Sequence, residues 1–237
     1  MKILRTGLLA IVTTLAISTS ALAVPLLPGG VIFPAGDTVV TAPNTAGVVR
    51  NDNLLPFSFD ITAFTGVGGN VQNRVAESSL LNTMVFAPRI RDTYNTATRN
   101  FMITGFRLDG YAGWDTDVGY RTDGLGDRGP SVISRSAGGG KLTFRYLEGS
   151  ELSVSGLLGG TQEESLFPYI TTDAPSYELT GTMTLFGYDV ADRSNLLSVE
   201  LAGLAVPASV PEPSAIWLLG SGLLGLLGFT RQRKQAV

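Results

Sequence analysis

The chain of 237 residues contains no cysteine and no histidine. Without cysteine it forms no disulfide bond, so a folded domain must depend on its apolar core. Without histidine it lacks the commonest general base, the usual zinc and copper ligand, and every Ser-His or Cys-His nucleophile. An enzyme built from this sequence would be restricted to carboxylate, Ser-Lys or oxygen-ligated metal chemistry.

Lysine is also scarce, and Lys141 is the only one between residues 24 and 210. In this stretch 19 acidic residues stand against 11 arginines and that one lysine, so the formal charge is −7. No basic run interrupts the acidity, and such a surface repels a phosphate backbone on average. Nucleic acid is therefore not an expected partner.

The first 23 residues are built in three parts. Lys2 and Arg5 precede an apolar stretch over residues 8–17, and the small-residue triplet Ala21-Leu22-Ala23 follows. This order is typical of a secretory signal peptide with its cleavage site. The apolar stretch is too short to span ~30 Å of hydrocarbon, which argues against a transmembrane helix. We predict export by the general secretory route, with signal peptidase releasing a mature chain that begins at Val24.

Alternation of apolar and polar residues dominates the middle of the chain. In FSFDITAF, Phe57, Phe59 and Ile61 share one face while Ser58 and Asp60 share the other, as in a half-buried strand. The same pattern predicts strands over 70–78, 83–88, 100–108, 141–147, 151–158, 166–172, 177–188 and 196–204, with short candidates at 38–41 and 47–50.

Glycine-rich turn clusters separate these segments, and only residues 74–84 approach a helical period. Many short strands joined by glycine turns predict an all-β fold. We expect a single antiparallel β-sandwich, jelly-roll-like, over residues 24–209. A barrel is the second arrangement.

Five aspartates crowd the stretch LDGYAGWDTDVGYRTDGLGDRGP, residues 108–130. Asp115, Asp117 and Asp123 could offer hard oxygen ligands to calcium, but the spacing is not that of an EF-hand loop. Asp and Gly are also the residues that β-turns use, and this is the interpretation we prefer. We therefore expect no metal and no cofactor, and keep these three aspartates as weak calcium candidates.

No catalytic motif stands out elsewhere. A glycosidase needs two carboxyl groups that face each other, one of them with a raised pKa. Nothing in the local sequence singles out such a pair among the available glutamates, which include Glu148, Glu151, Glu163, Glu164 and Glu178. AGGGKL lacks the residues that a phosphate loop requires. We expect a protein that is not an enzyme.

Three aromatic residues leave an alternative open. Trp114, Tyr111 and Tyr120 could stack on sugar rings if they are exposed, although such residues are more often core or loop anchors in a sandwich. The alternative function is therefore a carbohydrate-binding or carbohydrate-cleaving module.

The last 28 residues, VPEPSAIWLLGSGLLGLLGFTRQRKQAV, combine three features. Pro211 and Pro213 hold the backbone extended and display Glu212. Residues 215–229 are uncharged and mostly apolar, and we predict that they form a transmembrane helix of marginal length. A basic cluster follows in the place of cytoplasmic stop-transfer charges. It consists of Arg231, Arg233 and Lys234.

In this order and at this place, the three features resemble a PEP-CTERM sorting signal over residues 210–237. Proteins with this tail belong to Gram-negative bacteria that make exopolysaccharide. The resemblance implies that an exosortase, a membrane protease-transferase, recognises Pro211, Glu212 and Pro213 and processes the protein at the cell surface. Residues 114–146 and 171–187 also resemble, less specifically, β-rich domains of unassigned function that often precede such tails.

Together these signals predict the route and destination of the protein. We expect a transient inner-membrane intermediate held by the tail, followed by delivery to the cell envelope or the extracellular matrix. There the domain would act as a structural or adhesive component beside exopolysaccharide, for example in a biofilm.

Overall fold

The computed structural model describes residues 24–59, 66–96, 100–154 and 161–208. These residues form strands and one 3-10 turn, η1 (Pro43–Thr45), so the all-β prediction is confirmed. No helix in these ranges is long and apolar enough to cross a membrane. The predicted signal peptide and the predicted tail helix lie outside the described residues.

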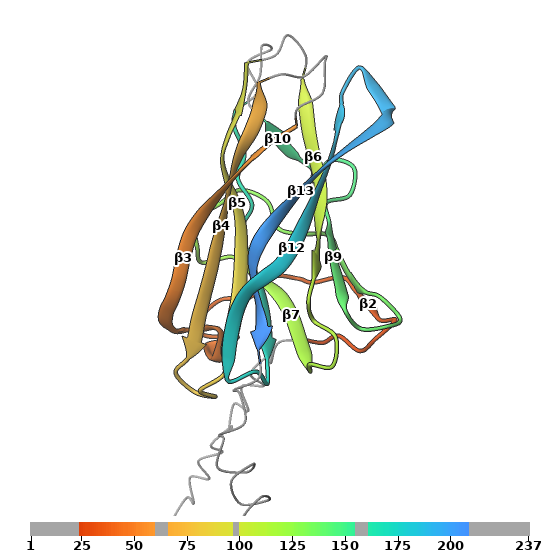
Figure 1. Ribbon diagram of the computed structural model, residues 1–237. Coiled ribbons are helices and arrows are strands. Elements are labelled where there is room, and N and C mark those ends of the chain that lie inside the picture. The colour runs from red at the N-terminus through yellow and green to blue at the C-terminus, as the bar shows by residue number, and fades with distance from the viewer. Residues whose placement is uncertain (1–23, 60–65, 97–99, 155–160, 209–237) are drawn as a thin grey trace, which may run out of the picture.

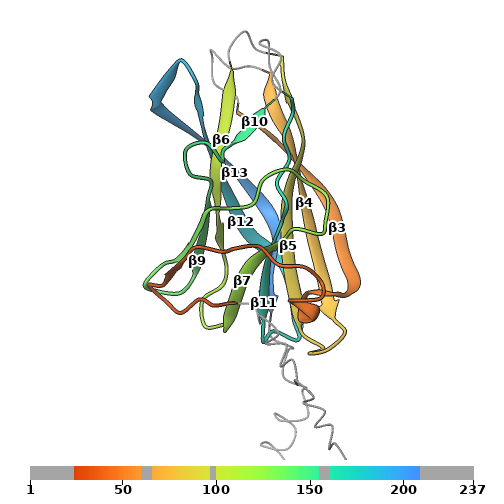
Figure 2. The same cartoon turned by 180° about the vertical axis from the view of Figure 1, so that it is seen from behind.

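The strands form two antiparallel sheets that face each other, as Figures 1 and 2 show from opposite sides. In order across the first sheet, the strands are β1 (Val24–Pro25), β7 (Thr116–Arg121), β11 (Phe167–Thr172), β5 (Met84–Asn95), β4 (Val67–Ser78) and β3 (Gly47–Ser58). Across the second they are β13 (Asp192–Ala208), β12 (Ser176–Asp189), β6 (Phe101–Asp109), β9 (Lys141–Arg145), β8 (Val132–Arg135) and β2 (Val31–Ile32), and β10 (Leu152–Val154) pairs with β6.

The core lies between the two sheets and is continuous. Val71, Phe86 and Ile90 project from the first sheet, and Phe106 and Phe144 from the second, and all five are at most 1% exposed. The rings of Phe106 and Phe144 stack with 4.7 Å between their centroids. This apolar layer supplies the stability that a chain without disulfides requires.

The predicted alternation in FSFDITAF is confirmed where the structure describes it. Phe57 and Phe59 are buried and Ser58 is exposed. Phe57 and Ser58 end a 12-residue strand, β3, that already begins at Gly47. Residues 60–65 of the predicted strand lie outside the described residues.

One local prediction, the strand at 38–41, is wrong, and the near-helical period of residues 74–84 produces no helix. Residues 38–41 form a turn in which the Thr41 and Ala42 amides donate to the Thr38 carbonyl at 3.1 and 2.8 Å. Val40 is 81% exposed, so an extended conformation there gains no stabilisation from burial of its side chain. Residues 74–84 are not helical, because they span the end of β4, a turn and the start of β5.

One strand lies inside the aspartate-rich stretch. β7 pairs with both β1 and β11, and Val118 is buried at 1% exposure. Its sequence, TDVGYR, carries turn residues, and only pairing with strands distant in the sequence makes it extended.

The two described ends of the chain lie at the same end of the sandwich. The Leu26 amide donates to the Thr116 carbonyl at 2.8 Å, and Thr116 pairs with Thr172. Four residues after Thr172, Ser176 pairs with Ala208. Figure 1 shows β13 ending there. We call this the terminal end, and the end at Asp189–Asp192 the distal end.

A buried amide links the two sheets. Asn73 on β4 is 3% exposed, its Nδ2 donates to the Gly203 carbonyl at 3.1 Å, and its Oδ1 accepts from the Ala205 amide at 3.0 Å. Both partners lie on β13, where Gly203 adopts a φ of 84°. The side chain thereby satisfies backbone groups at an irregular part of that strand.

Candidate functional site

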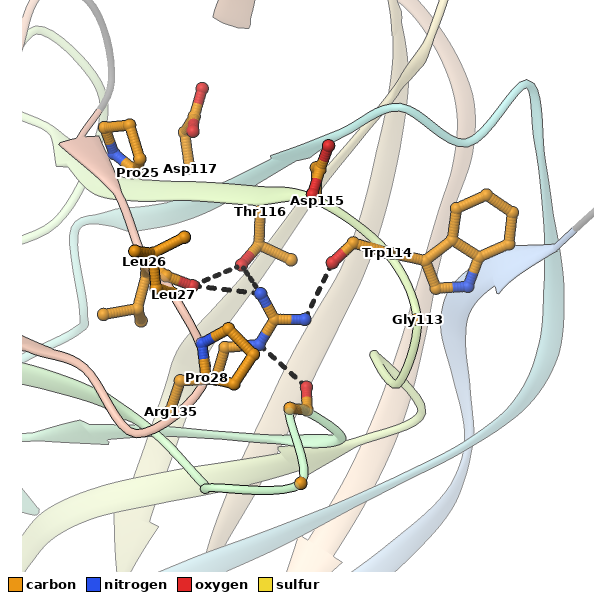
Figure 3. Close-up of a pocket in the computed structure, with 12 residues that line it drawn as sticks. Pro25, Leu26, Leu27, Pro28, Gly113, Trp114, Asp115, Thr116, Asp117 and Arg135 are labelled. Atoms are coloured by element: carbon orange, nitrogen blue, oxygen red, sulfur yellow. Dashed lines mark hydrogen bonds between the residues drawn. The ribbon is translucent and has the colours of Figure 1, made fainter.

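A pocket of about 640 Å³ opens at the terminal end. Residues 25–28 form one wall, the loop between β6 and β7 forms a second, and the turn between β8 and β9 forms a third. Figure 3 shows the Arg135 guanidinium in the middle of these walls. We call this cavity the terminal pocket.

Arg135, the last residue of β8, is 6% exposed, and all five of its N–H groups donate hydrogen bonds inside the protein. Nε donates to the Gly139 carbonyl at 2.8 Å, Nη1 to the Leu26 carbonyl at 3.0 Å and Thr116 Oγ1 at 2.8 Å, and Nη2 to the Tyr111 and Trp114 carbonyls at 3.0 and 2.7 Å.

This arrangement makes Arg135 a clamp and not an anion-binding group. Every partner is a carbonyl or a hydroxyl, and none is a carboxylate. Burial lowers the pKa of Arg135, and the nearby Asp115 carboxylate opposes that shift. Because no donor remains, the guanidinium has nothing to offer a phosphate or carboxylate that entered the pocket.

The three calcium candidates do not converge. Asp123 accepts two hydrogen bonds from Arg121, at 2.6 and 2.9 Å, and a third from the Val39 amide at 2.7 Å. The hydrogen bond from Arg121 is the main reason that the pKa of Asp123 is lowered. In the described part of the chain, no group of three or more His, Cys, Asp or Glu residues is placed to hold a metal ion.

Asp115 and Asp117 line the terminal pocket, and in Figure 3 their carboxylates point away from Arg135. The Asp115 amide donates to Asp173 Oδ1 at 3.1 Å, so turn chemistry accounts for part of this loop. Burial raises the pKa of Asp117, and the negative charge of Asp115 adds to that shift.

The three aromatic candidates for sugar stacking differ in exposure. Tyr111 is 1% exposed and packs edge-on against Phe86, so its ring cannot contact a ligand. Tyr120 is partly exposed, and its ring lies against Gly36 and Gly129, where an added Cβ would meet it at 2.8 and 2.4 Å. Trp114 is partly exposed and lines the terminal pocket.

The glutamates are dispersed over the molecule. Glu163 accepts from Arg128 at 3.0 and 2.8 Å, and Glu164 pairs with the buried Arg89. Glu178 is exposed on β12, and Glu148 and Glu151 lie on the loop that follows β9. The carboxylates of Glu163 and Glu164 are therefore engaged by arginine side chains.

By its fold, the described part of the chain is an antiparallel β-sandwich domain in which Val24 and Ala208 both lie at the terminal end. A family model described as PEP-CTERM protein-sorting motif matches residues 209–234, which begin directly after β13. The chain thus carries the sorting motif of an exosortase substrate, as the sequence predicted. No curated protein and no solved structure matches the chain.

The motif implies processing by exosortase, a membrane enzyme, and a membrane-anchored intermediate on the way to the cell envelope or surface. Pro211, Glu212 and Pro213 lie within the match, as do Arg231, Arg233 and Lys234. All six are outside the described residues, so their roles stay predictions.

Proposed function

We propose that this protein is exported by the general secretory route and is then sorted by exosortase, which recognises Pro211, Glu212 and Pro213. It then serves as a non-enzymatic structural or adhesive component of the cell envelope or extracellular matrix, beside exopolysaccharide. The observation that carries the proposal is the sorting motif that continues directly from β13. Because the tail follows the terminal end of the sandwich, the opposite, distal end is free to face away from the membrane, as in a surface-displayed protein.

The position of Val24 supports the proposed signal-peptide boundary. Val24 pairs with Val118 in β7, and Leu26 is held by Thr116 and Arg135. Val24, the first residue after the predicted cleavage site, is therefore already part of the sandwich.

The sorting step is tested by replacing Pro211, Glu212 and Pro213 with alanine and by deleting the exosortase gene. We expect the native protein to lose part of its tail and to reach the outer fractions. The variant, and the native protein in the deletion strain, should keep the whole tail and stay in the inner membrane. Intact-mass measurement and cell fractionation report both outcomes.

A matched control is Glu178→Ala, an exposed change on the sandwich that leaves the tail untouched. It should be processed like the native protein. Identical mass and location in the native, alanine-substituted and deletion samples would contradict exosortase sorting.

A carbohydrate-binding or carbohydrate-cleaving role is the second candidate. The partly exposed Trp114, beside Asp115 and Asp117 in a pocket of about 640 Å³, favours it, because an indole face and carboxylates can contact a sugar ring and its hydroxyls. A glycan array with a parallel hydrolysis assay separates the candidates. Binding that Trp114→Ala abolishes would support this pocket, and turnover would exclude the non-enzymatic proposal.

A further inference from the structure

A second concave surface lies on the outer face of the second sheet, towards the distal end. It has a volume of about 460 Å³, within the range of ordinary small-molecule sites. Its floor is formed by Thr104 on β6, Thr143 on β9 and Phe186 on β12. We call it the distal groove. Phe186 is ten residues beyond Ser176, so the groove lies about 33 Å along the strand from the terminal end.

The two walls of the distal groove come from different parts of the chain. Residues 146–151, which follow β9, form one wall, and the hairpin between β12 and β13 forms the other. Tyr188 Oη donates to Glu151 Oε1 at 3.1 Å, and Arg193 Nη1 donates to Glu148 Oε1 at 2.5 Å. Both contacts join the two walls: the Tyr188–Glu151 hydrogen bond is partly buried, whereas the Arg193–Glu148 pair is exposed and adds little rigidity.

The charges of the distal groove balance. Arg145 and Arg193 stand against Glu148 and Glu151. The surface therefore has no net attraction for a polyanion or a polycation, in contrast to a site for nucleic acid or a uronic acid polymer. An uncharged ligand is the class that this balance favours.

Hydrogen-bonding groups remain available in the groove. The guanidinium of Arg145 and the hydroxyls of Thr104 and Thr143 have no side-chain partner within the described ranges, and Arg145 is exposed. Threonine hydroxyls both donate and accept, as sugar hydroxyls do. A ligand rich in hydroxyl groups could therefore pair with the floor and one wall.

Apolar surface flanks these polar groups. Leu147 is 45% exposed and Leu196 is 69% exposed, one on each wall, and Phe186 is partly exposed on the floor. A pyranose ring presents C–H faces as well as hydroxyls, and such faces pack against leucine and aromatic side chains. The groove thus offers both kinds of contact that a sugar chain makes.

From this combination we infer that the distal groove binds a segment of an uncharged oligosaccharide or polysaccharide. Glu148 and Glu151 come from one loop and do not face each other across the groove, so the geometry suits binding and not glycosidic cleavage. The inference deepens the carbohydrate candidate by placing the site away from Trp114, and it is independent of sorting through the tail.

The test uses the exported chain with its tail, purified in detergent micelles. The probes are immobilised neutral oligosaccharides of the glucan, mannan and galactan types, with oligogalacturonate as the acidic counterpart. We expect at least one neutral probe to bind. Thr143→Phe places a ring on the floor and should weaken that binding by about tenfold or more. Arg145→Ala should weaken it by about three- to tenfold.

Thr182→Phe is the matched control, because Thr182 lies on the same sheet face as Thr143 but outside the groove. It should bind like the native chain, as should Trp114→Ala. Leu196→Ser changes a residue that is 69% exposed, so it keeps the test valid if Thr143→Phe folds poorly. Leu196→Ser should also reduce binding, while its melting temperature stays that of the native chain.

Three outcomes would overturn the inference. The first is that no neutral probe binds, and the second is that only oligogalacturonate binds and salt abolishes the signal. The third is that Trp114→Ala removes binding while Thr143→Phe and Leu196→Ser do not. That last result would leave the carbohydrate function standing and move it to the terminal pocket.

Discussion

Replacing Arg135 with methionine should destabilise the sandwich, because Arg135 is 6% exposed and all of its N–H groups donate hydrogen bonds within the protein. Its five hydrogen bonds join Leu26, Tyr111, Trp114, Thr116 and Gly139. At about 1 kcal/mol net for each bond, their loss costs at most about 5 kcal/mol. Water that enters the pocket and the avoided burial of a charge offset part of this, which leaves about 3 kcal/mol.

The assay is thermal unfolding followed by far-ultraviolet circular dichroism. For a domain of this size, 3 kcal/mol corresponds to a fall in melting temperature of about 6–12 °C. Limited proteolysis of the native state should also release the N-terminal segment earlier, because Leu26 loses its anchor. Methionine keeps most of the apolar length of the side chain, so the change isolates the guanidinium.

Arg145→Met is the control for this experiment. Arg145 is exposed and has no side-chain partner in the described part of the chain, so its loss should change stability by less than about 0.5 kcal/mol. If both variants melt within about 1 °C of the native protein, Arg135 is not a clamp and the reasoning from its hydrogen bonds is refuted.

Three further predictions concern stability. Asn73→Ala should lower the free energy of unfolding by about 2 kcal/mol, because the buried Ala205 amide and the Gly203 carbonyl lose their partner. Asn53→Ala, at an exposed position of β3, should be close to neutral. Urea unfolding of both variants measures the difference. The raised pKa of Asp117 means that the folded state holds its proton more tightly than the unfolded state, so stability falls as pH rises above about 4 and stays reduced at pH 7. Asp117→Asn should therefore melt higher than the native protein at pH 7 and equally at pH 3, and an equal difference at both values would exclude this linkage. EDTA should leave the melting temperature unchanged, since Asp123 is committed to Arg121 and Val39; a fall that calcium restores would revive the calcium candidates.

The strands with clear period-two alternation were predictable from the sequence. Phe57 and Phe59 alternate with Ser58, and Leu142 and Phe144 alternate with Thr143 in the same way. Such a pattern reports which side chains leave water, and that requirement is local. Where the pattern was weak, as in residues 38–41, the propensity of threonine and valine for strands was not enough.

The candidate sites were less predictable. Tyr111 and Trp114 are three residues apart and looked equivalent, but one ring is in the core and the other lines a pocket. The distal groove had no signal in the sequence, because its floor comes from three strands and its walls from two connections. The sequence identified Glu148 and Glu151 as available carboxylates. Their positions in the distal groove follow only from their contacts with Arg193 and Tyr188 in the folded structure.

The sequence by itself determined the C-terminal sorting motif and the all-β character, because a sorting motif is read as a linear segment and alternation repeats every two residues. Only the tertiary structure decided that TDVGYR is a strand, that Arg135 clamps segments up to 109 residues apart, and that a charge-balanced groove lies at the distal end. The physical reason is the same in each case. The packing of the sheets brings together the groups that accept hydrogen bonds from a buried guanidinium or that complete a groove. The spacing of these groups in the chain does not reveal that they are neighbours.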